Sequence, residues 1–214
     1  MEAPGVSNYE RLCEDWRKKF LGMDQEKLCK KLPELKKEGE YLTLLHFGRK
    51  FGVHRTTGKI AALADERPVS FTTQMDIYNL FWYSKETACI RNRWVPFRDV
   101  RDASPFAPAF ERNVLVPFAQ TFSGKTELLR KAAQSLDAEM VEHGDVGFIL
   151  KCFACIPMQF LFWDADDEFP AQSNILFDYG VTDYIHVEST VTLATEGMLR
   201  LTEAAGIKQK GSVL

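Results

Sequence analysis

The sequence contains no lysine or arginine between Lys151 and Arg200, an interval in which acidic residues are frequent. The rest of the chain is net positive. Together with the acidic interval, the whole protein has 27 basic and 30 acidic side chains and a net charge of −3. Proteins that bind nucleic acids or acidic membranes usually carry a basic excess, which is missing here. We therefore predict neither a nucleic-acid partner nor a membrane partner.

The short motifs of the common enzyme classes are also missing. The segment 123–126, SGKT, lacks the upstream glycine of a phosphate-binding P-loop, and there is no serine-hydrolase elbow. His46 and His54 flank the segment GRKFG and could face each other across a sheet, whereas His143 and His186 lie far along the chain. None of the four has the spacing of a metalloprotease site, so we interpret each as a structural or surface histidine.

Five cysteines are an odd number for a disulfide framework, which favours reduced thiols. The N-terminal segment has no basic stretch followed by an apolar one, so we expect no signal peptide and a soluble, cytoplasmic protein. Cys152 and Cys155 have the spacing of a redox pair but lie in an extended apolar run, where residues i and i+3 point to opposite faces. We interpret them as buried structural cysteines rather than a redox or metal-binding pair.

The longest apolar run is VGFILKCFACIPMQFLFW, at residues 146–163. A membrane-spanning helix needs about 20 apolar residues, and this run contains Lys151 and Pro157. Its many aromatic and β-branched residues predict two successive buried strands instead.

Helical and extended patterns alternate along the rest of the chain. Ser7 and Glu10 form a predicted capping box for a first helix, and a second short helix ends near Pro33. Strands follow over residues 40–64, with a tight turn at 57–58. Further helices are predicted over 73–86, over 104–122 with a kink at Pro117, over 124–140 and over 187–206.

This order of elements predicts an α+β fold, with a mainly antiparallel sheet, helices packed on it and an N-terminal helical pair. We expect residues 1–39 to form a helical extension, residues 40–206 a single α+β domain and residues 207–214 a C-terminal tail.

Four acidic residues lie between two apolar segments, in FWDADDEFPAQSNILFD at 162–178. Carboxylates at alternate positions are suitable oxygen ligands for a hard cation, although the glycine and spacing of a calcium loop are missing. A loop between buried strands must also be polar, because its backbone needs water. We favour a solvated turn and keep a metal site as the alternative, with four candidate ligands: Asp164, Asp166, Asp167 and Glu168.

The segment RNRWVPFRDVR at 91–101 concentrates arginines around aromatic residues. Guanidinium groups bind phosphates and carboxylates, and they can stack with aromatic rings on a flat ligand. The simpler interpretation, which we favour, is that these arginines pair with the acidic loop at 164–168. The segment is nevertheless the best candidate for an anion pocket.

Several segments resemble a family known only as a domain of unknown function, over about residues 40–200. They are HFGRKFGV, WVPFRDV followed by APAF, the pair Gly144-Asp145, and FLFWDADDEFPAQSNILFD. The resemblance implies members found mostly in anaerobic bacteria and archaea, some with an appended iron–sulfur module. The N-terminal helices of this chain hold only Cys13 and Cys29, too few for a four-cysteine cluster.

Three functional hypotheses follow. The first is a non-enzymatic ligand-binding or accessory module in anaerobic metabolism, which relies on the resemblance. The second is a small-molecule enzyme that uses the acidic loop for metal or acid–base chemistry, and the third is a protein-interaction domain that docks through its N-terminal helices. The sequence identifies no cofactor and allows a small-molecule or a protein partner. The candidate ligand-binding residues are Arg91, Arg93, Trp94, Arg98, Trp163 and Asp178.

Overall fold

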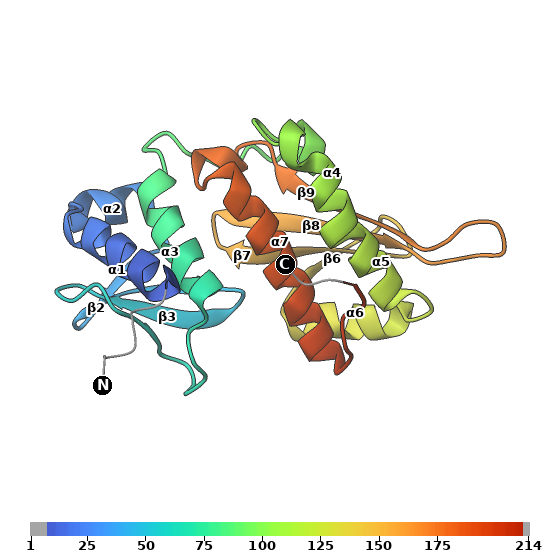
Figure 1. Cartoon of the computed structure of the whole chain (residues 1–214), viewed down its shortest axis with the longest axis horizontal. Coiled ribbons are helices and arrows are strands. Elements are labelled where there is room, and N and C mark those ends of the chain that lie inside the picture. The colour runs from blue at the N-terminus through green and yellow to red at the C-terminus, as the bar shows by residue number, and fades with distance from the viewer. Residues whose placement is uncertain (1–7, 212–214) are drawn as a thin grey trace.

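Two antiparallel sheets form the framework of the protein, for which a computed structural model describes residues 8–211 (Figure 1). The first sheet has the strand order β1-β2-β3-β4 and the second the order β5-β9-β8-β7-β6. The first contains β1 (Lys36–Glu38), β2 (Tyr41–His46), β3 (Arg49–His54) and β4 (Ile60–Ala62). The second contains β5 (Trp94–Pro96), β6 (Glu139–Val141), β7 (Val146–Phe153), β8 (Ile156–Trp163) and β9 (Gln172–Asp178).

The predicted strand pair at 146–163 is confirmed as β7 and β8, and the predicted turn at 57–58 joins β3 to β4. Gly58 adopts φ +72°, which a residue with a side chain rarely tolerates. His54 pairs with Tyr41, and His46 pairs with Arg49. The expectation that the two histidines face each other is therefore wrong, because they lie at opposite ends of the β2–β3 hairpin.

Three helices pack in the N-terminal half of the molecule, beside the first sheet (Figure 1). They are α1 (Asn8–Leu21), α2 (Gln25–Lys31) and α3 (Phe71–Tyr83). Phe20 of α1 is fully buried, with its ring centroid 5.7 Å from that of Phe81 in α3. The predicted capping residue Ser7 lies outside the described residues, and the boundaries at residues 39 and 206 stay predictions.

The helix predicted over 104–122 is divided into turns of different type, and the kink predicted at Pro117 stays a prediction. A 3₁₀ turn at Ser104–Phe106 leads into α4 (Ala107–Phe110), a π-helical turn at Glu111–Leu115 and α5 (Val116–Phe122). Proline has no N–H to donate to the carbonyl four residues earlier. The wider π turn ends at Leu115, two residues before Pro117, where the α-helical hydrogen-bond ladder is interrupted.

The last two helices are α6 (Thr126–Ser135) and α7 (Val187–Ala205), and Gly206 ends α7 in the left-handed conformation. In Figure 1, α5, α6 and α7 lie across one face of the second sheet. Helix α7 also contacts α3, so it links the two halves of the molecule. The predicted α+β fold with N-terminal helices is confirmed, with its strands divided between two sheets. In the part of the chain that the structure describes, no helix is long and apolar enough to cross a membrane.

Candidate functional site

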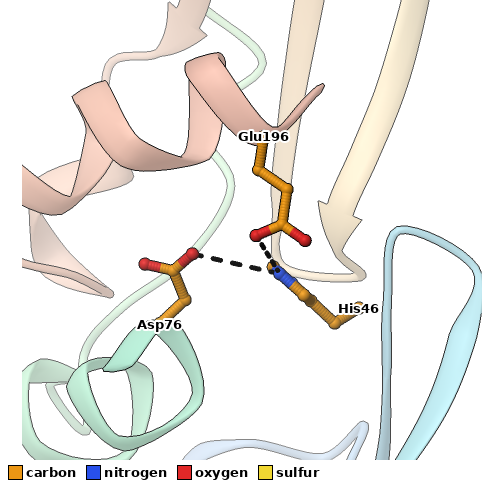
Figure 2. Close-up of side chains that lie close together, drawn as sticks. All are labelled: His46, Asp76 and Glu196. Carbon is orange, nitrogen blue, oxygen red and sulfur yellow. Dashed lines mark hydrogen bonds and ion pairs between the residues drawn. The ribbon is translucent and has the colours of Figure 1, made fainter. Parts of the chain in front are cut away.

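Three ionisable side chains meet at the point where the two halves of the molecule join (Figure 2). His46 ends β2, Asp76 lies in the middle of α3, and Glu196 lies in the middle of α7. Their exposed fractions are 0%, 1% and 6%. Charged groups are rarely buried to this extent without a specific partner. We refer to His46, Asp76 and Glu196 as the buried cluster.

The imidazole of His46 is oriented by the groups that its two ring nitrogens contact. Nδ1 lies 3.2 Å from the carbonyl oxygen of Cys152, which can only accept a hydrogen bond. Nδ1 therefore donates to this carbonyl, and Nε2 faces the two carboxylates. Nε2 lies 3.3 Å from Glu196 Oε2 and 3.9 Å from Asp76 Oδ2. The ring is also packed against Phe153, with centroids 4.6 Å apart.

Each carboxylate has one oxygen held from outside the cluster. Asp76 Oδ1 accepts a hydrogen bond of 3.0 Å from Thr192 Oγ1. Glu196 Oε1 accepts hydrogen bonds of 2.7 Å from Arg200 Nη2 and 3.3 Å from Thr73 Oγ1. The other oxygen of each carboxylate is directed at His46. Within residues 8–211, Asp76 Oδ2 is one of the few buried side-chain polar atoms that have no hydrogen-bond partner.

The two carboxyl groups differ in acidity. Burial, together with the charge of Glu196, raises the pKa of Asp76 well above its ordinary value. Burial also raises the pKa of Glu196, but the hydrogen bonds and charges of His46 and Arg200 outweigh it and lower this pKa to about 2. Two neighbouring carboxyl groups whose pKa values are shifted in opposite directions are a pattern found in acid–base catalytic sites.

A cavity of about 550 Å³ lies directly beside the buried cluster. We call it the α7 cavity. Glu196 belongs both to the cluster and to the cavity wall, and Thr192, which binds Asp76, lines the cavity as well. The remaining lining residues come from α7, from the segment that leads into α3 and from the first turn of α3: Arg67, Pro68, Ser70, Thr72, Thr195, Leu199, Arg200 and Glu203.

Some of the predicted ligand-binding residues come together elsewhere, at the β5–β9 edge of the second sheet. Trp94 is paired with Asp178 in the strand register. The buried Asp178 carboxylate accepts backbone hydrogen bonds of 2.9 Å from both Arg91 and Gly180. The guanidinium of Arg93 lies over the Tyr179 ring, 4.5 Å from its centroid.

Trp163 and Arg98 are not part of this group. Trp163 pairs with Gln172, at the other end of β9 from Asp178, and six residues of strand span about 20 Å. Arg98 is exposed at the surface. Whether the β5–β9 edge binds an anion stays a prediction.

The predicted pairing of the 91–101 arginines with the acidic loop is wrong for the two that form ion pairs. Arg91 and Arg101 pair with Asp183, at 3.4 and 2.9 Å, rather than with the acidic loop at 164–168. Lys85 joins the same carboxylate at 2.8 Å. The sequence hid this arrangement because Asp183 lies in a short 3₁₀ turn, far along the chain from the arginines.

The acidic loop has the hydrogen bonds of a capped turn. Asp164 Oδ1 accepts from the backbone of Gly124 at 2.8 Å, and Asp166 Oδ1 accepts from Glu168 and Phe169 at 2.9 and 2.7 Å. The side chains of Asp167 and Glu168 belong to exposed residues. These contacts account for Asp164 and Asp166 without a cation, and the alternative of a metal site in this loop stays a prediction.

Sequence reasoning treated His46 as an isolated histidine and missed Asp76 and Glu196. Asp76 is the acidic residue of a helix otherwise rich in buried apolar side chains. Glu196 lies between the inward-facing Leu193 and Met198 of α7. A carboxylate on an apolar helix face was the available signal, because such a group needs a partner in the core.

Fold and site together define an α+β protein with two antiparallel sheets and a histidine–dicarboxylate cluster beside a cavity. The chain belongs to the family described as a domain of unknown function, DUF3786, whose model matches residues 24–199. All three residues of the buried cluster fall inside that match. The predicted membership in a family of unknown function is confirmed, while the anaerobic distribution and the iron–sulfur appendage of relatives stay predictions. No curated protein and no solved structure matches the chain.

Proposed function

We propose that this protein binds a small polar molecule in the α7 cavity. The observation that carries the proposal is the position of the cavity, which shares Glu196 with the buried cluster. A volume of about 550 Å³ lies within the range of small-molecule sites, roughly 300–1,000 Å³. The proposal retains the ligand-binding hypothesis and moves it from the 91–101 segment to α7. A role in anaerobic metabolism stays a prediction.

The lining of the cavity favours a ligand with both hydrogen-bond donors and acceptors. Four hydroxyl groups, those of Ser70, Thr72, Thr192 and Thr195, can donate or accept. Leu199 and Pro68 supply an apolar contact surface.

The charges of the lining are balanced. Arg67 pairs with Asp65 at 2.7 Å, and Arg200 pairs with Glu196 at 2.7 Å and with Glu203 at 3.5 Å. A strongly charged ligand would have to compete with these pairs. We therefore expect a neutral or zwitterionic molecule.

A second candidate function is catalysis on a molecule bound in the same cavity. The observation that favours it is the contrast between Asp76, whose pKa is raised, and Glu196, whose pKa is lowered to about 2. Such a pair could move a proton to and from a substrate that reaches Glu196. The third hypothesis, protein interaction through the N-terminal helices, rests on exposed apolar residues such as Tyr9 and Leu12 and stays a prediction.

The test is a ligand-observed NMR screen of polar fragments against two matched variants. Leu199→Trp places a large side chain in the cavity without removing a group of the cluster. Leu12→Trp makes the same change on exposed α1, where Leu12 is 44% exposed. Fragments should bind the wild type and Leu12→Trp and should lose their signal with Leu199→Trp. Absence of binding fragments, or equal binding by both variants, would show the proposal to be wrong.

A further inference from the structure

We propose that His46, Asp76 and Glu196 form a binding site for one divalent transition-metal ion, of the kind represented by Zn²⁺, Mn²⁺ or Fe²⁺. The three potential ligand atoms all lie within 4.8 Å of one another. This site is separate from the acidic loop at 164–168, and it does not depend on a ligand in the α7 cavity.

The spacing of the donors fits a metal ion. Bonds of about 2.0–2.2 Å from nitrogen and oxygen ligands place neighbouring ligand atoms roughly 3–3.5 Å apart. The distance from His46 Nε2 to Glu196 Oε2, 3.3 Å, already lies in this range. The distance from Nε2 to Asp76 Oδ2, 3.9 Å, requires only a small inward movement of one side chain.

The groups around the donors have the arrangement of a metal site's outer shell. A metal-ligating histidine usually donates its other N–H to a carbonyl or carboxylate, and Nδ1 of His46 faces the Cys152 carbonyl. Thr192 holds the far oxygen of Asp76, while Arg200 and Thr73 hold the far oxygen of Glu196. Each of the three side chains is thus fixed at one atom and leaves another directed at the common centre.

An unpartnered atom at that centre is the second, independent observation. In the described part of the chain, Asp76 Oδ2 is buried and has no hydrogen-bond partner. A buried acceptor without a partner costs about 1–3 kcal/mol, and native proteins rarely leave one. Oδ2 faces His46 Nε2 at 3.9 Å and lies close to the Glu196 carboxylate, so a cation that displaces any proton between them would be coordinated by all three groups at once.

The donor set indicates the class of ion. Imidazole with carboxylates suits Zn²⁺, Mn²⁺ and Fe²⁺ better than Ca²⁺, which prefers six to eight oxygens, or Cu⁺, which prefers sulfur. The nearby thiol of Cys152 donates a hydrogen bond of 3.1 Å to the Ile156 carbonyl and is not one of the three grouped ligands. Three protein ligands leave at least one coordination position open, as in catalytic metal sites. Because Glu196 also lines the α7 cavity, we expect a further ligand to reach the ion from that side.

The experiment is a titration of chelator-treated, dialysed full-length protein with Zn²⁺ by calorimetry and with Co²⁺ by visible absorption. We expect one ion per chain, and a Co²⁺ spectrum typical of nitrogen and oxygen ligands. His46→Gln, Asp76→Asn and Glu196→Gln should each weaken binding at least 100-fold. The double variant Asp166→Asn/Glu168→Gln, in the acidic loop, should bind like the wild type. Circular dichroism of every variant verifies that the fold is kept.

Three results would overturn the proposal. One is the absence of stoichiometric binding by the wild type. Another is equal binding by the wild type and folded cluster variants, which would mean an adventitious ion only. The last is loss of binding in the acidic-loop variant alone, which would place the metal at residues 164–168. If a cluster variant fails to fold, the acidic-loop variant and the Co²⁺ spectrum together still decide, because a site in that loop would lose affinity in that variant.

Discussion

Gly197 of α7 lies against the ring of Phe160 in β8, so closely that a Cβ on residue 197 would stand 2.9 Å from Phe160 Cζ. Phe160 is fully buried and stacked on Phe148, with centroids 5.3 Å apart, and therefore has little room to move. This contact sets how deeply α7 packs on the sheet. It thereby fixes the position of the neighbouring Glu196 relative to His46.

Gly197→Ala should therefore destabilise the protein, although alanine is the better helix former. The gain in helix propensity is about 1 kcal/mol, whereas overpacking a core costs about 1–3 kcal/mol. We expect a net loss of about 1 kcal/mol in the free energy of unfolding, measured with urea. Gly22→Ala is the control, since the nearest atom to its Cβ would be 3.5 Å away. A Gly197→Ala protein as stable as the wild type would contradict this account of α7.

Asp178→Ala should be strongly destabilising, because this carboxylate organises the loop at 91–93. It is 3% exposed and accepts hydrogen bonds from the backbone of Arg91 and Gly180. Hydrogen bonds to a charged group contribute about 1.5–3 kcal/mol each, so the loss of these two predicts a destabilisation of about 3–6 kcal/mol. The exposed Asp167→Ala serves as the reference in the same thermal or urea measurement. If both variants lost equally little stability, the Asp178 carboxylate would have no structural role and would remain available for a ligand.

The pairs around Asp183 predict a loss of stability at low pH. Hydrogen bonds from Lys85 and Arg101 outweigh the effect of burial and lower the pKa of Asp183 to about 2. An aspartate in the unfolded chain has a pKa of about 3.9. Since the folded pKa is the lower one, the stabilisation is present above pH 4 and disappears as the pH falls towards 2.

The measurement compares the wild type with Asp183→Asn between pH 6 and pH 2. Because the basic partners are half exposed, we expect a difference of about 1 kcal/mol at pH 6 that vanishes near pH 2. A difference that stays constant over this range would show that the carboxylate charge is not what stabilises the loop.

Glu34 should give the opposite pH dependence, in which the folded protein loses stability as the pH rises. Burial raises its pKa, although a hydrogen bond of 3.3 Å from Cys155 Sγ partly offsets this. Because the folded pKa lies above the unfolded one, the native state loses stability as the pH rises through the unfolded value, about 4.3. Glu34→Gln has the same shape but does not ionise, so it should match the wild type at pH 4 and be the more stable protein at pH 7. Thermal unfolding of both proteins at these two pH values tests this, and an unchanged ranking would refute it.

Much of the fold could be predicted from local sequence patterns, whereas contacts between residues far apart in the chain could not. The run at 146–163 identified β7 and β8, because two long buried strands leave a continuous apolar sequence. The acidic turn was visible because its carboxylates are adjacent in the chain. Asp76 and Glu196 were not, since a single carboxylate in an apolar helix has no periodicity of its own. Nothing in one sequence shows that two such positions meet the same histidine.

The separation of the cluster residues along the chain has a consequence for biosynthesis. His46 and Glu196 are 150 positions apart, and Glu196 lies in the last helix. Chains are made from the N-terminus onwards, and their N-terminal parts fold first. The first sheet can therefore form before α7 has left the ribosome, but the three donors cannot meet until residue 196 has emerged, 150 positions after His46. A product truncated before residue 196 would contain His46 and Asp76 without Glu196, and so could not complete the buried cluster.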